Sequence, residues 1–261
     1  MDKLQIMSHI ENTRDYLIKT HFSEHSLLGL FLYGSQNYGF ATEESDIDLV
    51  AVVVPEWNDI VALKQPLSTT ITLPNGELCM VKDIRVMRDM LLKQNLNFIE
   101  TLFTEYKWVN PFYADIYQDY FLDNAETIAR YCPWRTLFSA LRQAAHKQKA
   151  TPKRVHNVAR FLYFAEMYDK GQPYVKCFRP EGKAAENLMQ LKLLSEDNPK
   201  LEKLYEAVLK KTEEALEKIE AMPLEKKNYR NEAVEEFTLD GVSEILTRYF
   251  NFDEIFLMGW E

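Results

Sequence analysis

Two aspartates separated by one residue, Asp46 and Asp48, have the type and spacing to do chemistry. In "SDIDLVAVVVP" they open a run of β-branched residues, and residues two apart in a strand point to the same side. Two ionised carboxylates about 6 to 7 Å apart repel each other unless a cation lies between them. Hard cations take oxygen ligands, and magnesium uses one or two carboxylates and fills its remaining positions with water and substrate phosphate. The pair therefore predicts a Mg²⁺ or Mn²⁺ site that acts on a phosphorylated substrate.

A small-residue turn precedes the aspartates. Gly34 and Ser35 directly follow the apolar run "LLGLFLY". A glycine at such a strand end lets backbone N–H groups and the serine hydroxyl approach a phosphate closely. The spacing of Gly34 and Gly39 matches the phosphate loop of many ATPases. Phe40 and Ala41 then stand where that motif requires Lys and Ser or Thr, so this interpretation fails.

A small sheet and its helices must position these residues. Apolar spacing in the first 20 residues predicts an amphipathic helix. Apolar and β-branched runs predict strands at 27–33, 47–55, 67–73 and 77–84. The last two flank "PNG", which favours a tight hairpin, and the apolar spacing turns helical after them. Residues 106–111 are typical of a connection that closes this first unit.

The second half of the chain predicts helices and no strand. Apolar residues at helical spacing continue from about residue 112, interrupted by prolines and glycines. We therefore expect two domains, at 1–110 and 111–261. Residues 142–160 contain six Lys or Arg and no acidic residue, a local excess in a chain of net charge −9. The net charge by itself argues against general attraction to nucleic acid.

The segment "LYGSQNYGFATEESDIDLVAVVV" resembles the signature of the DNA polymerase β nucleotidyltransferase superfamily. It is most similar to the predicted nucleotidyltransferase branch that includes the RNA-ligase-associated polymerase-β-like proteins. The matching positions are Gly34, Ser35, Tyr38, Gly39, Ala41, Thr42, Ser45, Asp46 and Asp48. Downstream, "NLNFIETLF" looks like a family segment in which Leu96 replaces the usual proline. The resemblance implies an α+β fold, with a polymerase-β-like catalytic domain followed by an all-helical domain.

The resemblance also implies roles for individual residues. Asp46 and Asp48 would bind metal, and a third carboxylate on a neighbouring strand would complete the site. Asp83 is our candidate for it because it ends a predicted strand, and Glu77 and Glu100 are the alternatives. The nucleotide-binding residues implied in this first half are Gly34, Ser35, Tyr38 and Ser45.

The basic stretch supplies the remaining nucleotide-binding candidates. Family members carry a Lys, a His or Asn, and an Arg on a helix after the catalytic domain, which would face the cleft. Lys153, His156, Asn157 and Arg160 are the matching positions, and a one-residue shift decides between His156 and Asn157. Lys153 and Arg160 would then neutralise triphosphate or nucleic-acid phosphates. A solvated basic helix face is the competing interpretation.

These observations predict a metal-dependent nucleotidyltransferase. It would transfer a nucleoside monophosphate from an NTP to an acceptor hydroxyl, with an RNA or tRNA end as the first choice, and release pyrophosphate. A protein side chain or a small molecule is another possible acceptor. A catalytically inactive binding module, such as a toxin–antitoxin component, and a metal-dependent phosphoesterase are the competing classes.

The rest of the composition bears on the compartment. No apolar run approaches the length of a membrane span, and the start of the chain lacks the pattern of a signal peptide. The three cysteines have neither metal-ligand nor redox-motif spacing, so we expect reduced, partly buried thiols. We therefore expect a cytoplasmic protein with no membrane partner.

Overall fold

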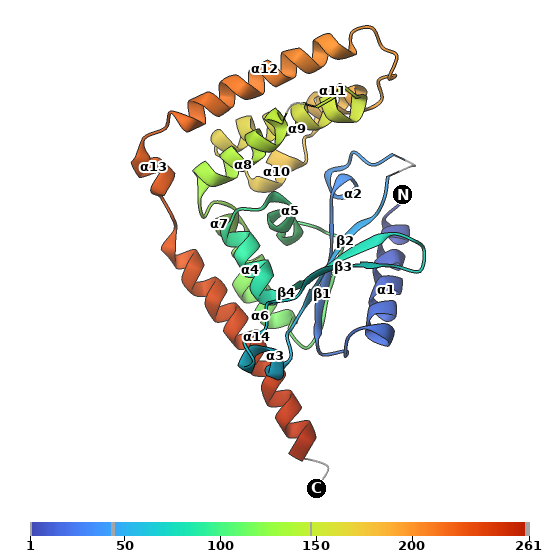
Figure 1. Cartoon of the computed structure of the whole chain (residues 1–261), viewed down its shortest axis with the longest axis vertical. Helices are drawn as coiled ribbons and strands as arrows, with labels where there is room; N and C mark the ends of the chain where they lie inside the picture. Colours follow the sequence, from blue (N-terminus) through green and yellow to red (C-terminus); the bar gives the residue numbers. More distant parts are fainter. Residues whose placement is uncertain (1, 43–44, 147, 259–261) are drawn as a thin grey trace. The chain divides into compact units, whose positions relative to one another are not determined.

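The structure is a computed structural model that describes residues 2–42, 45–146 and 148–258, without the side chains of 252–258 (Figure 1). The described residues form two compact units. The first, called the sheet unit, comprises residues within 1–93, 97–128 and 232–261. The second, called the helical unit, comprises 94–96 and 129–231.

A mixed five-stranded sheet organises the sheet unit, with strand order β3-β4-β2-β1-β5. The strands are β1 (Leu27–Tyr33), β2 (Asp48–Val53), β3 (Ser68–Thr72), β4 (Leu78–Asp83) and β5 (Lys107–Val109). β1 pairs antiparallel with β2 and with β5, and β3 pairs antiparallel with β4. β2 and β4 run parallel. Because β2 and β4 run parallel, the start of β2 lies beside the start of β4, and the end of β2 beside the end of β4.

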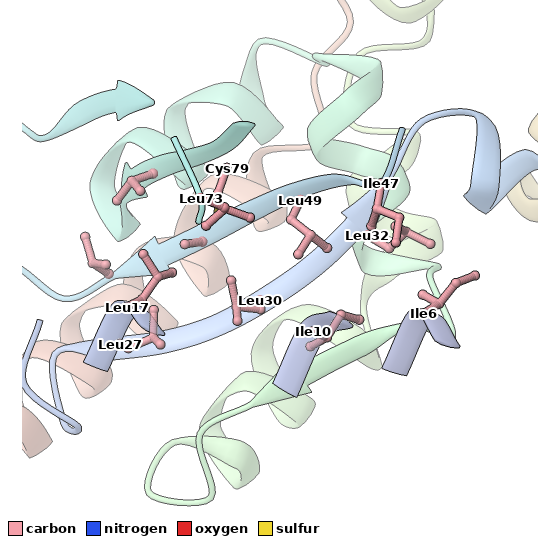
Figure 2. Close-up of a cluster of buried hydrophobic side chains, with 13 residues drawn as sticks. Ile6, Ile10, Leu17, Leu27, Leu30, Leu32, Ile47, Leu49, Leu73 and Cys79 are labelled. Atoms are coloured by element: carbon pink, nitrogen blue, oxygen red, sulfur yellow. The ribbon is translucent and has the colours of Figure 1, made fainter. Parts of the chain in front are cut away.

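The core on one face of the sheet lies beneath α1 (Lys3–Thr20) (Figure 2). Asp2 and Gln5 form a capping box that begins this helix, with Gln5 N donating to Asp2 Oδ1 at 2.9 Å. Buried side chains from α1, β1 and the start of β2 pack there: Ile6, Ile10, Leu17, Leu27, Leu30, Leu32, Ile47 and Leu49. Fully burying such side chains stabilises a fold by about 1.5 to 3 kcal/mol each, so this face is held firmly.

The other helices of the sheet unit come from distant parts of the chain. They are α2 (Ser35–Tyr38), α3 (Trp57–Val61), α4 (Ile84–Leu92), α5 (Leu96–Ile99), the 3₁₀ turn η1 (Glu100–Leu102), α6 (Ala114–Tyr117), the π-helical turn η2 (Gln118–Leu122), α7 (Ala125–Ala129) and α14 (Glu232–Met258). The boundary of the two units falls within α5, after Leu96, and within α7, before Ala129.

α14 returns to the sheet unit after the whole helical unit (Figure 1). Arg248 on α14 forms a bidentate ion pair with Asp115, with nitrogen–oxygen distances of 2.6 and 2.9 Å. A Cβ added to Gly241 would lie 2.7 Å from Tyr120 Cβ, so α14 approaches η2 too closely for a larger residue. The first unit therefore needs residues from both ends of the chain.

The described residues of the helical unit form six helices. They are α8 (Pro133–Ala145), α9 (Pro152–Asp169), α10 (Tyr174–Phe178), α11 (Gly182–Lys192), α12 (Leu201–Glu220) and α13 (Leu224–Asn228). Thr151 caps α9 by accepting a hydrogen bond from Arg154 N at 3.1 Å, and Pro152 occupies its first turn. α9 thus begins with residues that are typical of a helix start.

The α+β class is confirmed, and so are the predicted opening helix, the four strands and the hairpin around "PNG". The prediction for 106–111 is wrong, because Lys107–Val109 is strand β5, paired with β1. All described elements after residue 112 are helices. Residues 112–128 and 232–258 nevertheless group with the sheet unit. The division into domains at 1–110 and 111–261 therefore stays a prediction.

Two smaller expectations concern cysteines and membranes. All three cysteines are free and buried, rather than partly buried. Within the described part of the chain, no helix is both long and apolar enough to cross a membrane.

Candidate functional site

The turn at the end of β1 requires glycine at position 34 for two reasons. Gly34 has φ +80° and ψ −158°, a backbone conformation that L side chains rarely adopt. A Cβ built on Gly34 would lie 2.3 Å from Asp48 Oδ2. The carboxylate of Asp48 therefore packs directly against the backbone of Gly34. The structure thus brings the predicted phosphate turn and one predicted metal ligand together.

The short helix α2 continues this turn through backbone hydrogen bonds. Asn37 N and Tyr38 N both donate to Gly34 O, at 3.0 and 3.2 Å. Phe40 N donates to Ser35 O at 3.1 Å, and Gly39 ends the turn with φ +78°. Ser35 and Tyr38 are half-buried. Local hydrogen bonding therefore holds the backbone around Ser35 in place.

Gln36 joins this turn to the segment that precedes β2. Its amide Nε2 donates to Ser45 O at 3.3 Å. Ser45 Oγ in turn accepts from Thr42 N at 2.9 Å and lies 3.2 Å from Thr42 Oγ1. The hydroxyl of Ser45, a predicted nucleotide-binding group, thus hydrogen-bonds Thr42. Sequence reasoning missed Gln36 because a glutamine carries no motif of its own.

The side chain of Asp48 lies opposite the core face. Leu49, the next residue of β2, is buried in the cluster beneath α1, and successive strand residues point to opposite faces. Asp46 is exposed and Asp48 is half-buried. β2 begins at Asp48, and Asp46 therefore stands just before the strand.

The register of β2 and β4 does not bring Asp83 to this pair. Val53, at the far end of β2, pairs with Asp83, and the two strands run parallel. Five residues of strand, about 16 Å, therefore separate Asp83 from Asp48 along the sheet. Asp83 is buried, caps α4 through Arg85 N at 2.8 Å, and pairs with Arg85 Nη2 at 2.5 Å. The prediction that Asp83 completes the metal site thus conflicts with the strand direction, which our sequence reasoning had assumed to be favourable.

The two alternative carboxylates differ in their positions. Glu77 lies on the core side: its Oε2 is 3.1 Å from His9 Nε2 of α1 and accepts from Asn75 Nδ2 at 2.7 Å. Glu100, buried in η1, accepts a hydrogen bond from Gly34 N at 3.0 Å. Of the three candidates, Glu100 is therefore the one in contact with the phosphate turn.

Tyr33 reports the electrostatics of this end of the sheet. Burial raises the pKa of Tyr33 above its ordinary value, and the negative charges of Asp48 and Glu100 raise it further. Tyr33 is also the cross-strand partner of Asp48. The end of β1 is therefore an acidic environment. Among the described residues, no group of three or more His, Cys, Asp or Glu side chains gathers as a ready metal centre.

The four predicted nucleotide-binding residues of the second half lie on α9, in the helical unit. Lys153 is exposed, Asn157 is half-buried, and Arg160 is buried with its guanidinium 4.4 Å from the ring centroid of Phe161. Lys192 at the end of α11 lies near two of them: burial lowers its pKa, and the charges of Lys153 and Arg160 lower it further. Lys192 is a cationic neighbour that sequence reasoning missed.

His156 is committed to the interior of the helical unit. Its Nδ1 lies 2.8 Å from Leu188 O on α11, and its side chain is 3% exposed. Burial lowers the pKa of His156 to about 4, with a further contribution from the charge of Arg160. The imidazole is therefore neutral near pH 7, and Nδ1 is the donor in this hydrogen bond. This leaves Asn157 as the better placed of the two alternative counterparts.

Comparisons with known proteins give a distant likeness. No family model matches the chain, and no curated protein sequence matches it. Among solved structures, the chain is similar to the crystal structure of a nucleotidyltransferase-like protein from Exiguobacterium sibiricum 255-15. The identity is 15%, the match covers 78% of this chain and 74% of that chain, and the TM-score is 0.29. An overlap this low establishes neither the detailed fold nor the activity of this chain.

Proposed function

We propose that this chain is a metal-dependent nucleotidyltransferase that transfers a nucleoside monophosphate from an NTP to an acceptor hydroxyl. The contact between Gly34 and Asp48 is the observation that carries this proposal. It joins a glycine turn with positive φ, followed by the N–H and hydroxyl groups of Ser35 that would contact phosphate, to a carboxylate suited to Mg²⁺ or Mn²⁺. The resemblance of residues 34–48 to the polymerase-β-type signature agrees with this chemistry.

Asp46 and Asp48 are the residues that would hold the metal. Their exposed and half-buried positions suit magnesium, which uses one or two protein carboxylates and keeps the rest of its coordination for water and phosphate. A bound Mg²⁺ would neutralise the charge of the triphosphate. Two carboxylates therefore suffice for one ion, and the distant Asp83 is not needed for it.

Glu100 would act as a positioning residue for the phosphate turn. Its hydrogen bond fixes the N–H group of Gly34 at the end of β1. The N–H and hydroxyl groups of Ser35 would then contact the leaving phosphates. The acceptor oxygen bonds to the α-phosphorus, the bond from that phosphorus to the bridging oxygen breaks, and pyrophosphate leaves while the hydroxyl proton passes to water. Positioning and charge stabilisation supply the rate enhancement.

Lys153, Arg160 and Lys192 form a cationic group within the helical unit, because their charges act on one another or on His156 across α9 and α11. We propose that this group binds phosphates of the acceptor. An RNA or tRNA end is the proposed acceptor. Protein and small-molecule acceptors are alternatives that the same experiment distinguishes.

Labelled nucleotides test the proposal directly. The full chain is incubated with each α-³²P-labelled NTP, Mg²⁺ or Mn²⁺, and either total RNA or RNA-depleted cell extract. We expect label on RNA, with one pyrophosphate released per nucleotide added, and loss of both with Asp48→Asn. Label on protein would change the acceptor and keep the reaction class.

Two outcomes would overturn the proposal. Release of free labelled nucleotide without transfer would indicate a phosphoesterase. Absence of any NTP turnover, with intact binding of a partner protein, would indicate an inactive module of the toxin–antitoxin kind.

A further inference from the structure

The two units differ sharply in charge. The helical unit contains 21 Lys and Arg against 13 Asp and Glu, a formal charge of +8. The sheet unit contains 10 Lys and Arg against 27 Asp and Glu, a formal charge of −17. A strong sign difference between units is typical of proteins in which one part binds a polyanion. The overall charge of −9 hides a basic unit that could attract phosphates.

An aromatic column lies along α8 in this basic unit. The rings of Trp134 and Phe138, one helical turn apart, stack with centroids 4.9 Å apart and planes 13° from parallel. Cations lie at both ends of the column. The guanidinium of Arg142 is 5.5 Å from the Phe138 ring centroid, and Lys227 Nζ is 5.9 Å from that of Trp134. Both rings are half-buried and Arg142 is exposed, so part of each ring reaches the surface.

A shallow hollow of about 640 Å³ opens beside this column. It is lined by Phe138, Ser139, Arg142, Gln143, Ala145 and His146. The lining offers an aromatic ring, a guanidinium, an amide and a hydroxyl, and none of these lining residues is acidic. Pockets of roughly 300 to 1,000 Å³ hold small organic molecules, so a nucleoside fits this volume.

The end of α8 that borders the hollow is held in place. Arg154 Nη2, from the first turn of α9, donates to Ala144 O at 3.2 Å and also to His146 O. These bonds satisfy carbonyls at the C-terminal end of α8 that have no partner within the helix. A preorganised surface loses less entropy when a ligand binds.

We propose that this surface of α8, formed by Trp134, Phe138, Arg142 and the adjoining hollow, binds single-stranded nucleic acid. One base stacks on the exposed side of the Arg142 guanidinium and covers the part of the Phe138 ring that reaches the surface, because every base has a π-face that aromatic rings and Arg can contact. Gln143 hydrogen-bonds a base edge, while the positive charge of the unit attracts the phosphates. A single strand fits better than a duplex, whose bases are already stacked on one another. The acceptor role of this strand rests on the proposed function, but its binding does not.

Fluorescence anisotropy with fluorescein-labelled 12-nucleotide RNA and DNA strands tests the proposal on the full chain. We expect both strands to bind, and Phe138→Leu to weaken the binding by about 5- to 150-fold, the value of one base–aromatic stack. Leucine preserves an apolar side chain, and thermal unfolding verifies that the variant is folded. Tyr229→Leu, which removes an exposed ring elsewhere in the helical unit, is the matched control and leaves the affinity unchanged.

The salt dependence supplies a second, independent measurement. Arg142→Gln lowers the slope of log affinity against log salt by about 0.7 if Arg142 also neutralises one phosphate. Lys210→Gln, the same loss of charge on an exposed lysine of α12, leaves the slope unchanged. Absence of binding to either strand at low salt overturns the proposal, as does equal weakening by Phe138→Leu and Tyr229→Leu. Capture of a protein by this surface, without binding of either strand, also overturns it.

The binding test is separable from the nucleotidyl-transfer test. Asp48→Asn abolishes transfer and leaves strand binding unchanged if both proposals hold. Strand binding without transfer in the wild-type chain rejects the proposed function and keeps this surface. If the KM for the RNA acceptor is the same in Phe138→Leu as in the wild-type chain, this surface is rejected as the acceptor site.

Discussion

Asp48 and Asp83 occupy opposite ends of the same parallel strand pair, and their surroundings differ. Asp83 is buried, pairs with Arg85 at 2.5 Å and caps α4, so its charge is neutralised by its own helix. Asp48 is half-buried, packs on Gly34, and shares its end of the sheet with Asp46 and Glu100. A carboxylate held by a guanidinium stabilises the fold, whereas acids gathered around a glycine turn suit a cation. The neighbours of a carboxylate, rather than its place at a strand end, therefore indicate its role.

The largest expected effect is on the rate of nucleotide transfer, when Asp46 or Asp48 is substituted. Asp48→Asn or Asp46→Asn should lower kcat for nucleotide incorporation by at least about 10³-fold, or roughly 4 kcal/mol, because the metal loses a charged ligand. Thermal unfolding should show a folded protein in both cases. Asp83→Asn, assayed where the protein is folded, should retain kcat within about threefold. Loss of transfer in Asp83→Asn alone would reverse the assignment.

The next largest effect is on the stability of the fold, when Asp83 is substituted. Asp83→Asn should lower the free energy of unfolding by about 3 kcal/mol, because the buried carboxylate loses its charge-assisted hydrogen bonds to the partly exposed guanidinium of Arg85 and the cap of α4 is weakened. Urea titration measures this loss. The matched variant Asp89→Asn removes an exposed ion pair with Lys93 on the same helix and should cost at most about 1 kcal/mol.

His156 extends the comparison to the helical unit, as another buried group committed to a structural partner. The folded state lowers its pKa from 6.5 to about 4, so between these pH values the unfolded state binds a proton that the folded state excludes. The contribution of neutral His156 to the free energy of unfolding should therefore be fully present above about pH 6.5. It should fall by roughly 3 kcal/mol as the pH approaches 4. Urea titrations across this range measure the loss, and His156→Asn, which cannot titrate, should show a shallower dependence. An identical pH dependence in the variant would contradict the prediction.

Gly34 allows the contact with Asp48 to be isolated from backbone strain. Gly34 and Gly39 both have positive φ, but a Cβ on Gly39 meets nothing within 4 Å, whereas one on Gly34 meets Asp48 Oδ2 at 2.3 Å. Gly34→Ala should therefore cost about 2 kcal/mol more in unfolding free energy than Gly39→Ala. In an Asp48→Ala background the cost of Gly34→Ala should fall, and the part that remains measures the strain of its backbone at ψ −158°, which Gly39, at ψ +18°, does not share. An unchanged cost in that background would place the clash elsewhere.

Glu100 gives the smallest effect and separates positioning from metal binding. Glu100→Gln keeps an oxygen that can accept from Gly34 N, so transfer should remain near the wild-type rate. Glu100→Ala removes the acceptor and should raise KM for NTP by about tenfold, or roughly 1.4 kcal/mol. If Glu100 instead binds metal, Glu100→Gln should lose about as much kcat as Asp48→Asn. Steady-state kinetics distinguish the two cases.

Local pattern was sufficient to predict the elements around the site. The β-branched run before Pro55 and the apolar run 27–33 became β2 and β1, and Asn-Gly at 75–76 lies in the hairpin turn between β3 and β4. The strand β5 was missed because Lys107–Val109 is three residues long and too short to show alternation. Its pairing partner, β1, is far away in the chain.

The parts of the site that the sequence left open or missed depend on contacts between distant residues. Glu100 meets Gly34 across 66 positions of the chain, and Lys192 lies on a different helix from Lys153 and Arg160. Asp83 was chosen because it ends a strand, but whether strands run parallel or antiparallel is a property of the assembled sheet. Similarly, α14 joins the sheet unit through Arg248 and Asp115, which are 133 positions apart.

The sequence by itself determined the glycine turn, the aspartate pair and the elements that flank them, because turn formation, side-chain alternation and apolar periodicity act over a few neighbouring residues. Tertiary structure alone decided that Asp48 packs on Gly34, that Glu100 rather than Asp83 reaches this turn, and that His156 is buried and neutral. Strand direction, burial and pKa depend on which distant segments pack together. No short segment contains that information.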